Sequence, residues 1–151
     1  MRLIEPSSAD EYRQYYDLRW RILRAPWDQP RGSECDAQDA GSTHLMLVDG
    51  GGKPLAVGRL HFNTIREAQI RFMAVEVAQQ RSGLGSRLLD ALEHRAHALG
   101  ASRIVLDARE TALGFYRKQG YAVDGAGHTL FNRIAHVKMS KRFGGSTAQG
   151  R

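Results

Sequence analysis

The 151-residue sequence contains one cysteine and no long hydrophobic run. A single cysteine, Cys35, excludes an intramolecular disulfide and any zinc site built from several cysteines. The apolar runs, such as residues 45–48, are far shorter than the roughly 20 residues of a membrane-spanning helix. The first residues lack a basic stretch followed by an apolar one, so we expect a cytoplasmic protein. With no internal repeat or linker, we expect one domain over residues 1–142 and a flexible tail over residues 143–151.

Acidic side chains are scarce in the later part of the chain. The sequence has 22 Lys and Arg residues against 16 Asp and Glu residues, a net charge of +6. Residues 1–50 carry nine acids and six bases, whereas residues 101–151 carry three acids and nine bases. A basic surface suits an anionic partner, and nucleic acid, a membrane surface and a phosphorylated cofactor all meet that condition. Charge alone therefore does not choose among these partners.

The hydrophobic pattern predicts a regular succession of strands and helices. Ser8 and Glu11 form a capping-box pattern that opens a helix ending near residue 23, and an irregular loop follows over residues 25–42. The other expected elements are strands over 2–5, 44–49, 55–63, 67–77, 103–107, 121–124 and 134–139, and helices over 83–100 and 111–119. This order predicts an α/β fold of the α+β type, in which helices cover a mixed sheet.

One turn in this succession has the composition of a phosphate-binding loop. The strand over 67–77 leads through Gln80-Arg81-Ser82-Gly83-Leu84-Gly85-Ser86 directly into an amphipathic helix. Glycines allow the backbone to approach a ligand, and the first amides of a helix lack intrahelical acceptors. The helix dipole and Arg81 add positive charge, so the turn is suited to a diphosphate. It lacks the Lys-Ser/Thr ending of a P-loop and the third glycine of a dinucleotide fingerprint.

A second motif follows at residues 112–121, Ala-Leu-Gly-Phe-Tyr-Arg-Lys-Gln-Gly-Tyr. Together with Gln80-Arg81-Ser82-Gly83-Leu84-Gly85, and with this order of elements, it resembles the GNAT superfamily of acyl-CoA-dependent N-acetyltransferases over nearly the whole chain. Residues 18–20, 30–34 and 36 are similar to a bacterial GNAT subgroup whose members are sometimes fused to a hotdog thioesterase-like domain. The resemblance implies the GNAT fold, acetyl-CoA as acyl donor and a primary amine of a small molecule or peptide as acceptor.

The resemblance also implies which residues hold the cofactor. The backbone of the central strand would pair with the pantetheine arm, and one of its amides would polarise the acetyl carbonyl. A β-bulge is common in that strand. In many family members an Asn stands where this chain has Arg109. The expected cofactor-binding residues are Met73, Ala74, Val75, Gln80, Arg81, Ser82, Gly83, Leu84, Gly85, Ser86, Arg109 and Tyr116.

Two residues are expected to handle protons. Tyr116, in the second motif, corresponds to the general acid that reprotonates the leaving thiolate in this family. Gln69 occupies the position where some members carry a catalytic Glu, and an amide cannot act as a base. Glu67, two residues earlier and on the same strand face, is the substitute candidate, with Glu76 and His61 behind it.

The acceptor site and the wider function have alternatives. Trp20, Arg24 and Trp27 either line the acceptor pocket together with the loop over 25–42 or pack that loop. A non-catalytic acyl-CoA-binding sensor is the first rival, because the base is uncertain. A basic nucleic-acid-binding module is the second, although no helix-turn-helix pattern supports it. We expect no metal, nucleic-acid or membrane partner, and the edge strands of this fold are compatible with a homodimer.

Overall fold

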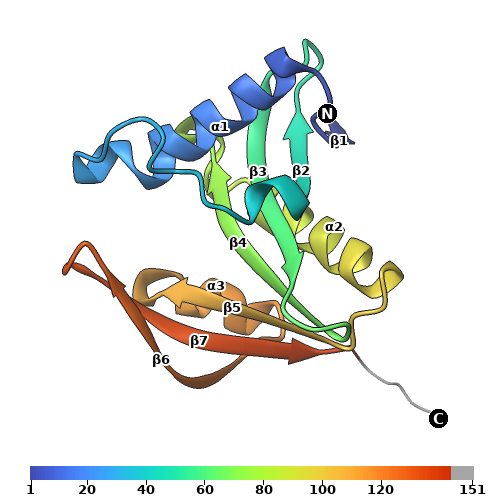
Figure 1. Ribbon diagram of the computed structural model, residues 1–151, viewed down its shortest axis with the longest axis vertical. Helices are drawn as coiled ribbons and strands as arrows, with labels where there is room; N and C mark the ends of the chain where they lie inside the picture. Colours follow the sequence, from blue (N-terminus) through green and yellow to red (C-terminus); the bar gives the residue numbers. More distant parts are fainter. Residues whose placement is uncertain (144–151) are drawn as a thin grey trace. The chain divides into compact units, whose positions relative to one another are not determined.

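The computed structural model describes residues 1–143 and contains seven strands and three α-helices in that range (Figure 1). The predicted tail over 143–151 lies, apart from Phe143, outside the described residues. The main elements are β1 (Arg2–Ile4), α1 (Ala9–Leu23), β2 (Thr43–Val48), β3 (Pro54–Phe62), β4 (Glu67–Val75), α2 (Leu84–Ala98), β5 (Arg103–Arg109), α3 (Leu113–Lys118), β6 (Ala122–Leu130) and β7 (Ile134–Arg142). No helix among these residues is long and apolar enough to span a membrane.

The order of elements and the mixed α+β class agree with the prediction from the sequence. The strands follow one another in the sheet as β1-β2-β3-β4-β5-β7-β6. The β1–β2, β2–β3, β5–β7 and β6–β7 pairs are antiparallel, and β4 pairs with β5 in parallel. The described β4–β5 ladder joins Glu67–Gln69 to Arg103–Val105. β5 pairs with β7 along its whole length, from Arg103 to Arg109.

β6 is longer than the sequence indicated. A strand was expected over residues 121–124, whereas β6 continues to Leu130 and pairs with β7 up to the turn. The sequence pattern did not predict this part of the strand because Gly125 and Gly127 have low strand propensity. The register also shifts between Val123 and Gly125 and again between Ala126 and Thr129, so the side chains do not alternate regularly.

The chain forms two compact units, which are described separately. Unit 1 comprises residues 1–61 and 71–94, and unit 2 comprises residues 62–70 and 95 onwards. In unit 1, α1 and α2 pack on opposite faces of the strands (Figure 1). Val57 belongs to the cluster that Tyr15 and Leu18 of α1 complete. Its neighbour Gly58 points to the other face, where a Cβ atom would lie 2.8 Å from Cδ1 of Leu92 in α2. Gly58 thus lets α2 approach β3 closely.

The capping box predicted for α1 is present. The Oγ atom of Ser8 accepts a hydrogen bond from the amide of Glu11 at 3.0 Å, and the Glu11 carboxylate accepts one from the amide of Ser8. Asp10 and Glu11 in the first turn also suit the positive end of the helix dipole. These contacts fix where α1 begins, and its buried side chains Tyr15, Leu18 and Arg19 fix the face that packs on the strands.

Two fully buried arginines hold the centre of unit 1. Nη1 of Arg19 and Nη1 of Arg59 each lie 3.0 Å from Oδ1 of Asp39. Arg59 also contacts Asp36 at 2.5 Å, and Arg19 donates to the Tyr15 hydroxyl at 3.1 Å. Four of these five groups, all except Asp36, are less than a tenth exposed. Removing one partner of such a buried ion pair lowers the stability of the fold, because the remaining charge would be left without compensation.

We expect Asp39→Asn to lower the free energy of unfolding by about 3 kcal/mol at neutral pH, because it leaves two buried guanidinium groups facing a neutral amide. Burial alone would raise the pKa of Asp39, but the Asp36 amide and the guanidinium groups of Arg19 and Arg59 outweigh it and lower the pKa. The carboxylate therefore stabilises the fold above the unfolded pKa of about 3.9, and that contribution is lost as the pH falls through the folded value. Urea unfolding at neutral and acidic pH measures both effects.

The matched control is Asp10→Asn, which removes an exposed carboxylate bound to Arg13 and Gln14. We expect this change to cost less than about 1 kcal/mol. Equal losses in the two variants would show that the buried position of Asp39 adds nothing to stability.

Candidate functional site

The predicted phosphate-binding turn has the backbone geometry of an anion site. Arg81 and Gly83 have left-handed backbone, with φ of 67° and 88°. Left-handed residues in a turn direct successive N–H groups towards one side, and such concave arrangements bind anions. The helix α2 begins at Leu84, so the amides of Leu84, Gly85 and Ser86 have no acceptor within residues 1–143. These donors and the positive end of the helix dipole face the same side of the turn.

The side chains of the turn leave this backbone accessible. A Cβ atom at Gly83 would meet nothing within 4 Å, and Arg81, Ser82 and Gly83 are exposed. The Ser82 hydroxyl donates back to the carbonyl of Gln79, and the side-chain amide of Gln80 donates through Nε2 to the carbonyl of Val75 at 3.1 Å. Both side chains therefore brace the turn rather than fill it. A diphosphate can approach the free amides without displacing a side chain.

The segment Met73–Val75 follows a marked irregularity in β4. Phe72 has a φ of 57°, which is rare for a non-glycine residue and interrupts the extended strand. The family resemblance implies a β-bulge in this strand, and the left-handed Phe72 is an irregularity of β4. Guanidinium carbons of Arg19, Arg59 and Arg71 lie 4.4, 4.7 and 4.7 Å from the centre of the Phe72 ring. These cation–π contacts and the buried ion pairs hold the irregular residue in place.

The end of β4 is anchored by a bidentate ion pair. Nη1 and Nη2 of Arg21 donate to the two carboxylate oxygens of Glu76 at 3.0 and 2.9 Å. Arg21 lowers the pKa of Glu76, and the Glu76 amide donates to the carbonyl of Leu55 at 2.8 Å. Glu76, a reserve candidate for the base, is therefore an ion-paired anchor of the strand directly before the phosphate-binding turn.

Unit 2 carries Tyr116 and Arg109. The Tyr116 ring packs edge-on against Phe115 and Tyr121, with ring centres 5.0 and 5.8 Å apart. Burial raises the pKa of Tyr116 to about 12, and Arg109 opposes that change. The phenol thus stays protonated at neutral pH and offers an O–H donor. Arg109, at the end of β5, is half-buried and close enough to Tyr116 for this electrostatic effect.

Glu67, the predicted base, lies at the start of β4 in unit 2. Its Oε1 atom accepts from Nη1 of Arg103 at 2.8 Å, and its Oε2 atom accepts from the Asn63 amide at 3.0 Å. Asn63 also donates to Oε1 of Gln69 at 3.0 Å. Both carboxylate oxygens are therefore engaged, although the side chain remains about a quarter exposed.

The three residues expected near the acceptor organise the loop that follows α1. The Trp20 indole donates to the carbonyl of Gln29 at 3.0 Å, and the Arg31 guanidinium stacks on the same indole at 4.1 Å. Arg24 is buried and donates to the carbonyl of Ser33 at 3.0 Å. The Trp27 carbonyl accepts from the Gln29 side chain at 3.1 Å. Both indoles keep part of their surface exposed, so packing of the loop leaves them open to a ligand.

His61 and Cys35 have surroundings that suit neither a base nor a nucleophile. Nη2 of Arg59 lies 3.2 Å from Nδ1 of His61, and because a guanidinium only donates, this nitrogen is an acceptor and the hydrogen of the neutral ring is on Nε2. Burial and the neighbouring Glu34 raise the pKa of the Cys35 thiol to about 11, so it is not a thiolate at neutral pH. Within residues 1–143 no group of three or more metal-ligating side chains occurs.

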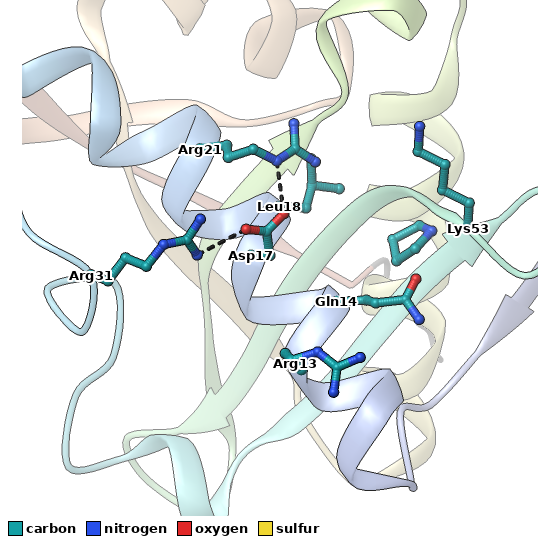
Figure 2. A pocket seen from close by; sticks show the side chains of 8 residues that line it. Arg13, Gln14, Asp17, Leu18, Arg21, Arg31 and Lys53 are labelled. Atoms are coloured by element: carbon teal, nitrogen blue, oxygen red, sulfur yellow. Dashed lines mark hydrogen bonds and ion pairs between the residues drawn. The ribbon is translucent and has the colours of Figure 1, made fainter.

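A surface pocket of about 290 Å³ in unit 1 has none of the predicted site residues in its lining (Figure 2). Its one carboxylate, Asp17, accepts from Arg21 at 2.8 Å and from Arg31 at 2.9 Å. Burial alone would raise the pKa of Asp17, but these two arginines lower it. The pocket therefore has no carboxylate left for a cationic ligand. It is lined by Arg13, Gln14, Asp17, Leu18, Arg21, Arg31, Lys53 and Pro54.

Two groupings of residues were not predicted from the sequence, in which His128 and His136 were each interpreted as an ordinary satisfied or exposed histidine. The first is the buried Arg19–Asp39–Arg59 cluster, which no local motif marks. The second is a pair of stacked imidazoles, His128 on β6 and His136 on β7, with ring centres 4.3 Å apart. A signal for the second pair was present, because residues 128 and 136 are equally distant from the turn at Asn132 and so pair across a hairpin. It was missed because the expected strand ended at residue 124.

Comparison with known proteins agrees with this geometry. Residues 12–121 match the model of the Acetyltransferase (GNAT) family. The chain is 26% identical to the uncharacterised N-acetyltransferase YjcF of Bacillus subtilis strain 168 over 141 residues, which cover 93% of this chain and 99% of that protein.

Solved structures with low sequence identity share the fold. An acyl-CoA N-acyltransferase from Pseudomonas aeruginosa superposes with a TM-score of 0.77 at 21% identity, covering 93% of this chain and 97% of that one. An aminoglycoside 6′-N-acetyltransferase complexed with coenzyme A also gives 0.77, at 17% identity, covering 94% and 97%. Because the family match covers more than two thirds of the chain and agrees with its phosphate-binding turn, irregular central strand and second motif, the protein belongs to the GNAT family of acetyltransferases.

Proposed function

We propose that the protein transfers an acetyl group from acetyl-CoA to a primary amine. The observation that carries this proposal is the open turn at Arg81–Ser86, where unbonded amides, left-handed residues and the start of α2 form a site for a diphosphate. Coenzyme A contains such a diphosphate, and a GNAT neighbour with this fold was crystallised with coenzyme A. Residues Gln80 to Ser86 would hold it in this chain.

The rest of the cofactor would follow the backbone of β4. After the left-handed Phe72, the residues Met73, Ala74 and Val75 offer peptide groups to an extended pantetheine arm, in the manner of an added strand. The carbonyl of Val75 is already bonded to the Gln80 side chain, which fixes the backbone at the end of this segment. An amide aimed at the acetyl oxygen would stabilise the negative charge that develops on it.

The reaction needs proton transfers at both the amine and the thiolate. A lysine-like amine with a pKa of about 10.4 must lose a proton before it attacks, which costs about 4.6 kcal/mol at pH 7. The neutral amine then forms a C–N bond to the acetyl carbon and gives up a further N–H proton, the C–S bond breaks, and the thiolate of CoA takes up a proton. Tyr116 is the proposed donor to that thiolate. Because its pKa of about 12 lies above that of an ordinary thiol, near 8.5, hydrogen bonding to the developing thiolate is its main contribution.

The proposed acceptor is a primary amine of unspecified type. The nine acids of residues 1–50 suggested a cationic amine, but several of them are occupied by arginines of the same unit. Asp39 binds two buried arginines, Asp36 binds Arg59, and Asp17 binds Arg21 and Arg31. The acidic composition of this part of the chain therefore stabilises unit 1 and is a weak guide to the acceptor.

We expect isothermal titration to show micromolar binding of CoA and acetyl-CoA. Gly83→Ala should weaken both by at least tenfold, because a side chain at a φ of 88° forces the turn to rearrange. The matched control is Gly50→Ala, at an open position whose φ is not left-handed, and its affinity should equal that of the wild type. Millimolar or absent binding by the wild-type protein would contradict the proposed function.

We expect Tyr116→Phe to lower kcat by about 10²-fold, because the leaving thiolate loses its hydrogen-bond donor. The dissociation constant for acetyl-CoA should change little, since the ring still packs against Phe115 and Tyr121. Release of free CoA thiol measures the rate, and titration measures the affinity. Tyr12→Phe, which removes a hydroxyl from α1, is the control. An unchanged kcat in Tyr116→Phe would remove Tyr116 from this role.

A further inference from the structure

The β6–β7 hairpin in unit 2 holds two imidazoles face to face. The rings of His128 and His136 are 4.3 Å apart at their centres and inclined by 15°. Nδ1 of His136 lies 3.0 Å from the carbonyl oxygen of Ile134 and 3.2 Å from that of His128. Because carbonyl oxygens only accept, Nδ1 of His136 carries the hydrogen, and the orientation of its ring is fixed. His136 thus forms a rigid platform beneath His128.

A carboxylate lies beside the second imidazole. Oδ2 of Asp107, on β5, is 3.7 Å from Nδ1 of His128. A carboxylate on this side favours the tautomer with hydrogen on Nδ1, which leaves the lone pair of Nε2 free to accept a proton. The His128 side chain is 44% exposed, whereas that of Asp107 is 22% exposed. The pair thus has a partly shielded orienting group and an accessible proton acceptor.

This pair shares a neighbour with Tyr116. Arg109 follows Asp107 by two residues on β5 and faces His136 in the β5–β7 ladder. The same Arg109 acts electrostatically on both His136 and Tyr116. The imidazoles therefore lie in the part of unit 2 that carries the proposed general acid. Glu67, by comparison, has both carboxylate oxygens engaged by Arg103 and Asn63.

We propose that His128 is the general base that takes the proton from the acceptor amine, with Asp107 orienting its ring and His136 supporting it. This inference rests on the proposed acetyltransferase function. As the nitrogen forms its bond to the acetyl carbon and the C–S bond breaks, one N–H proton passes to Nε2 of His128. The thiolate receives a proton by way of Tyr116. Solvent then takes the proton from His128 and restores that of Tyr116, so the products are the amide and free CoA thiol.

The charges around His128 determine how it holds that proton. Asp107 is the carboxylate placed to act as counter-ion while the His128 ring carries the proton. Asp124, the other nearby acid on β6, is occupied by Arg103 at 3.0 Å. The titratable and charged groups on the strands around His128 are Arg103, Asp107 and Arg109 on β5, Asp124 on β6, and His136, Lys138, Lys141 and Arg142 on β7.

The test compares the pH dependence of acetyl transfer in matched variants, with an amine found by screening the wild-type protein. We expect His128→Gln to lower kcat/KM about 10²-fold at neutral pH and to abolish the acidic limb of the profile. Asp107→Asn should lower it about tenfold, and the double variant should be no worse than His128→Gln alone. Affinity for acetyl-CoA should stay within twofold. His94→Gln, on the exposed side of α2, is the control with an unchanged rate and profile.

Chemical rescue separates a catalytic role from a structural one. Added imidazole should increase the rate of the His128→Ala variant at least tenfold. It should not change the rate of the Glu67→Gln variant. A full rate and an unchanged acidic limb in His128→Gln, together with their loss in Glu67→Gln, would overturn this proposal and make Glu67 the base. If the wild-type protein binds CoA but releases no thiol with any amine, the acetyltransferase proposal itself fails, and the role of His128 fails with it.

Discussion

The left-handed backbone of Phe72 is the constraint on which the rest of unit 1 depends. A non-glycine residue in this conformation costs about 1–3 kcal/mol, so the surrounding structure must hold it there. Arg19 and Arg59 do so by stacking on its ring while their charges are compensated by Asp39. The conformation sets the direction of the backbone that follows. The two arginines therefore influence the segment Met73–Val75 indirectly, through the backbone conformation of Phe72.

Charge has different uses along the chain. In residues 1–50, Asp36 and Asp39 neutralise buried arginines and Asp17 pairs with arginines nearer the surface, so these carboxylates are not free. Arg81, at the phosphate-binding turn, has no carboxylate partner within residues 1–143 and stays exposed. Its charge remains available to an anion. The same residue type thus stabilises the interior at Arg19 and stays exposed at Arg81, and only the surroundings distinguish the two.

Local sequence was sufficient wherever a contact joins residues close in the chain. The capping box of Ser8 and Glu11 predicted the start of α1, and Gly83 marked the turn before α2, because both depend on backbone groups within a few residues. The extent of β6 was not predictable in this way, because its pairing with β7 overrides the low strand propensity of Gly125 and Gly127. The error concealed His128, which lies in the part of β6 that was missed.

The sequence alone determined the order of elements, the glycine turn before α2 and the family to which the chain belongs, since all three depend on residue type and spacing along the chain. The tertiary structure decided which charges are compensated and which side chains meet. Asp39 lies between two arginines 20 residues away on either side, and Asp107 reaches a histidine 21 residues later. Such contacts arise from packing and strand register, and no local pattern encodes the distance between them.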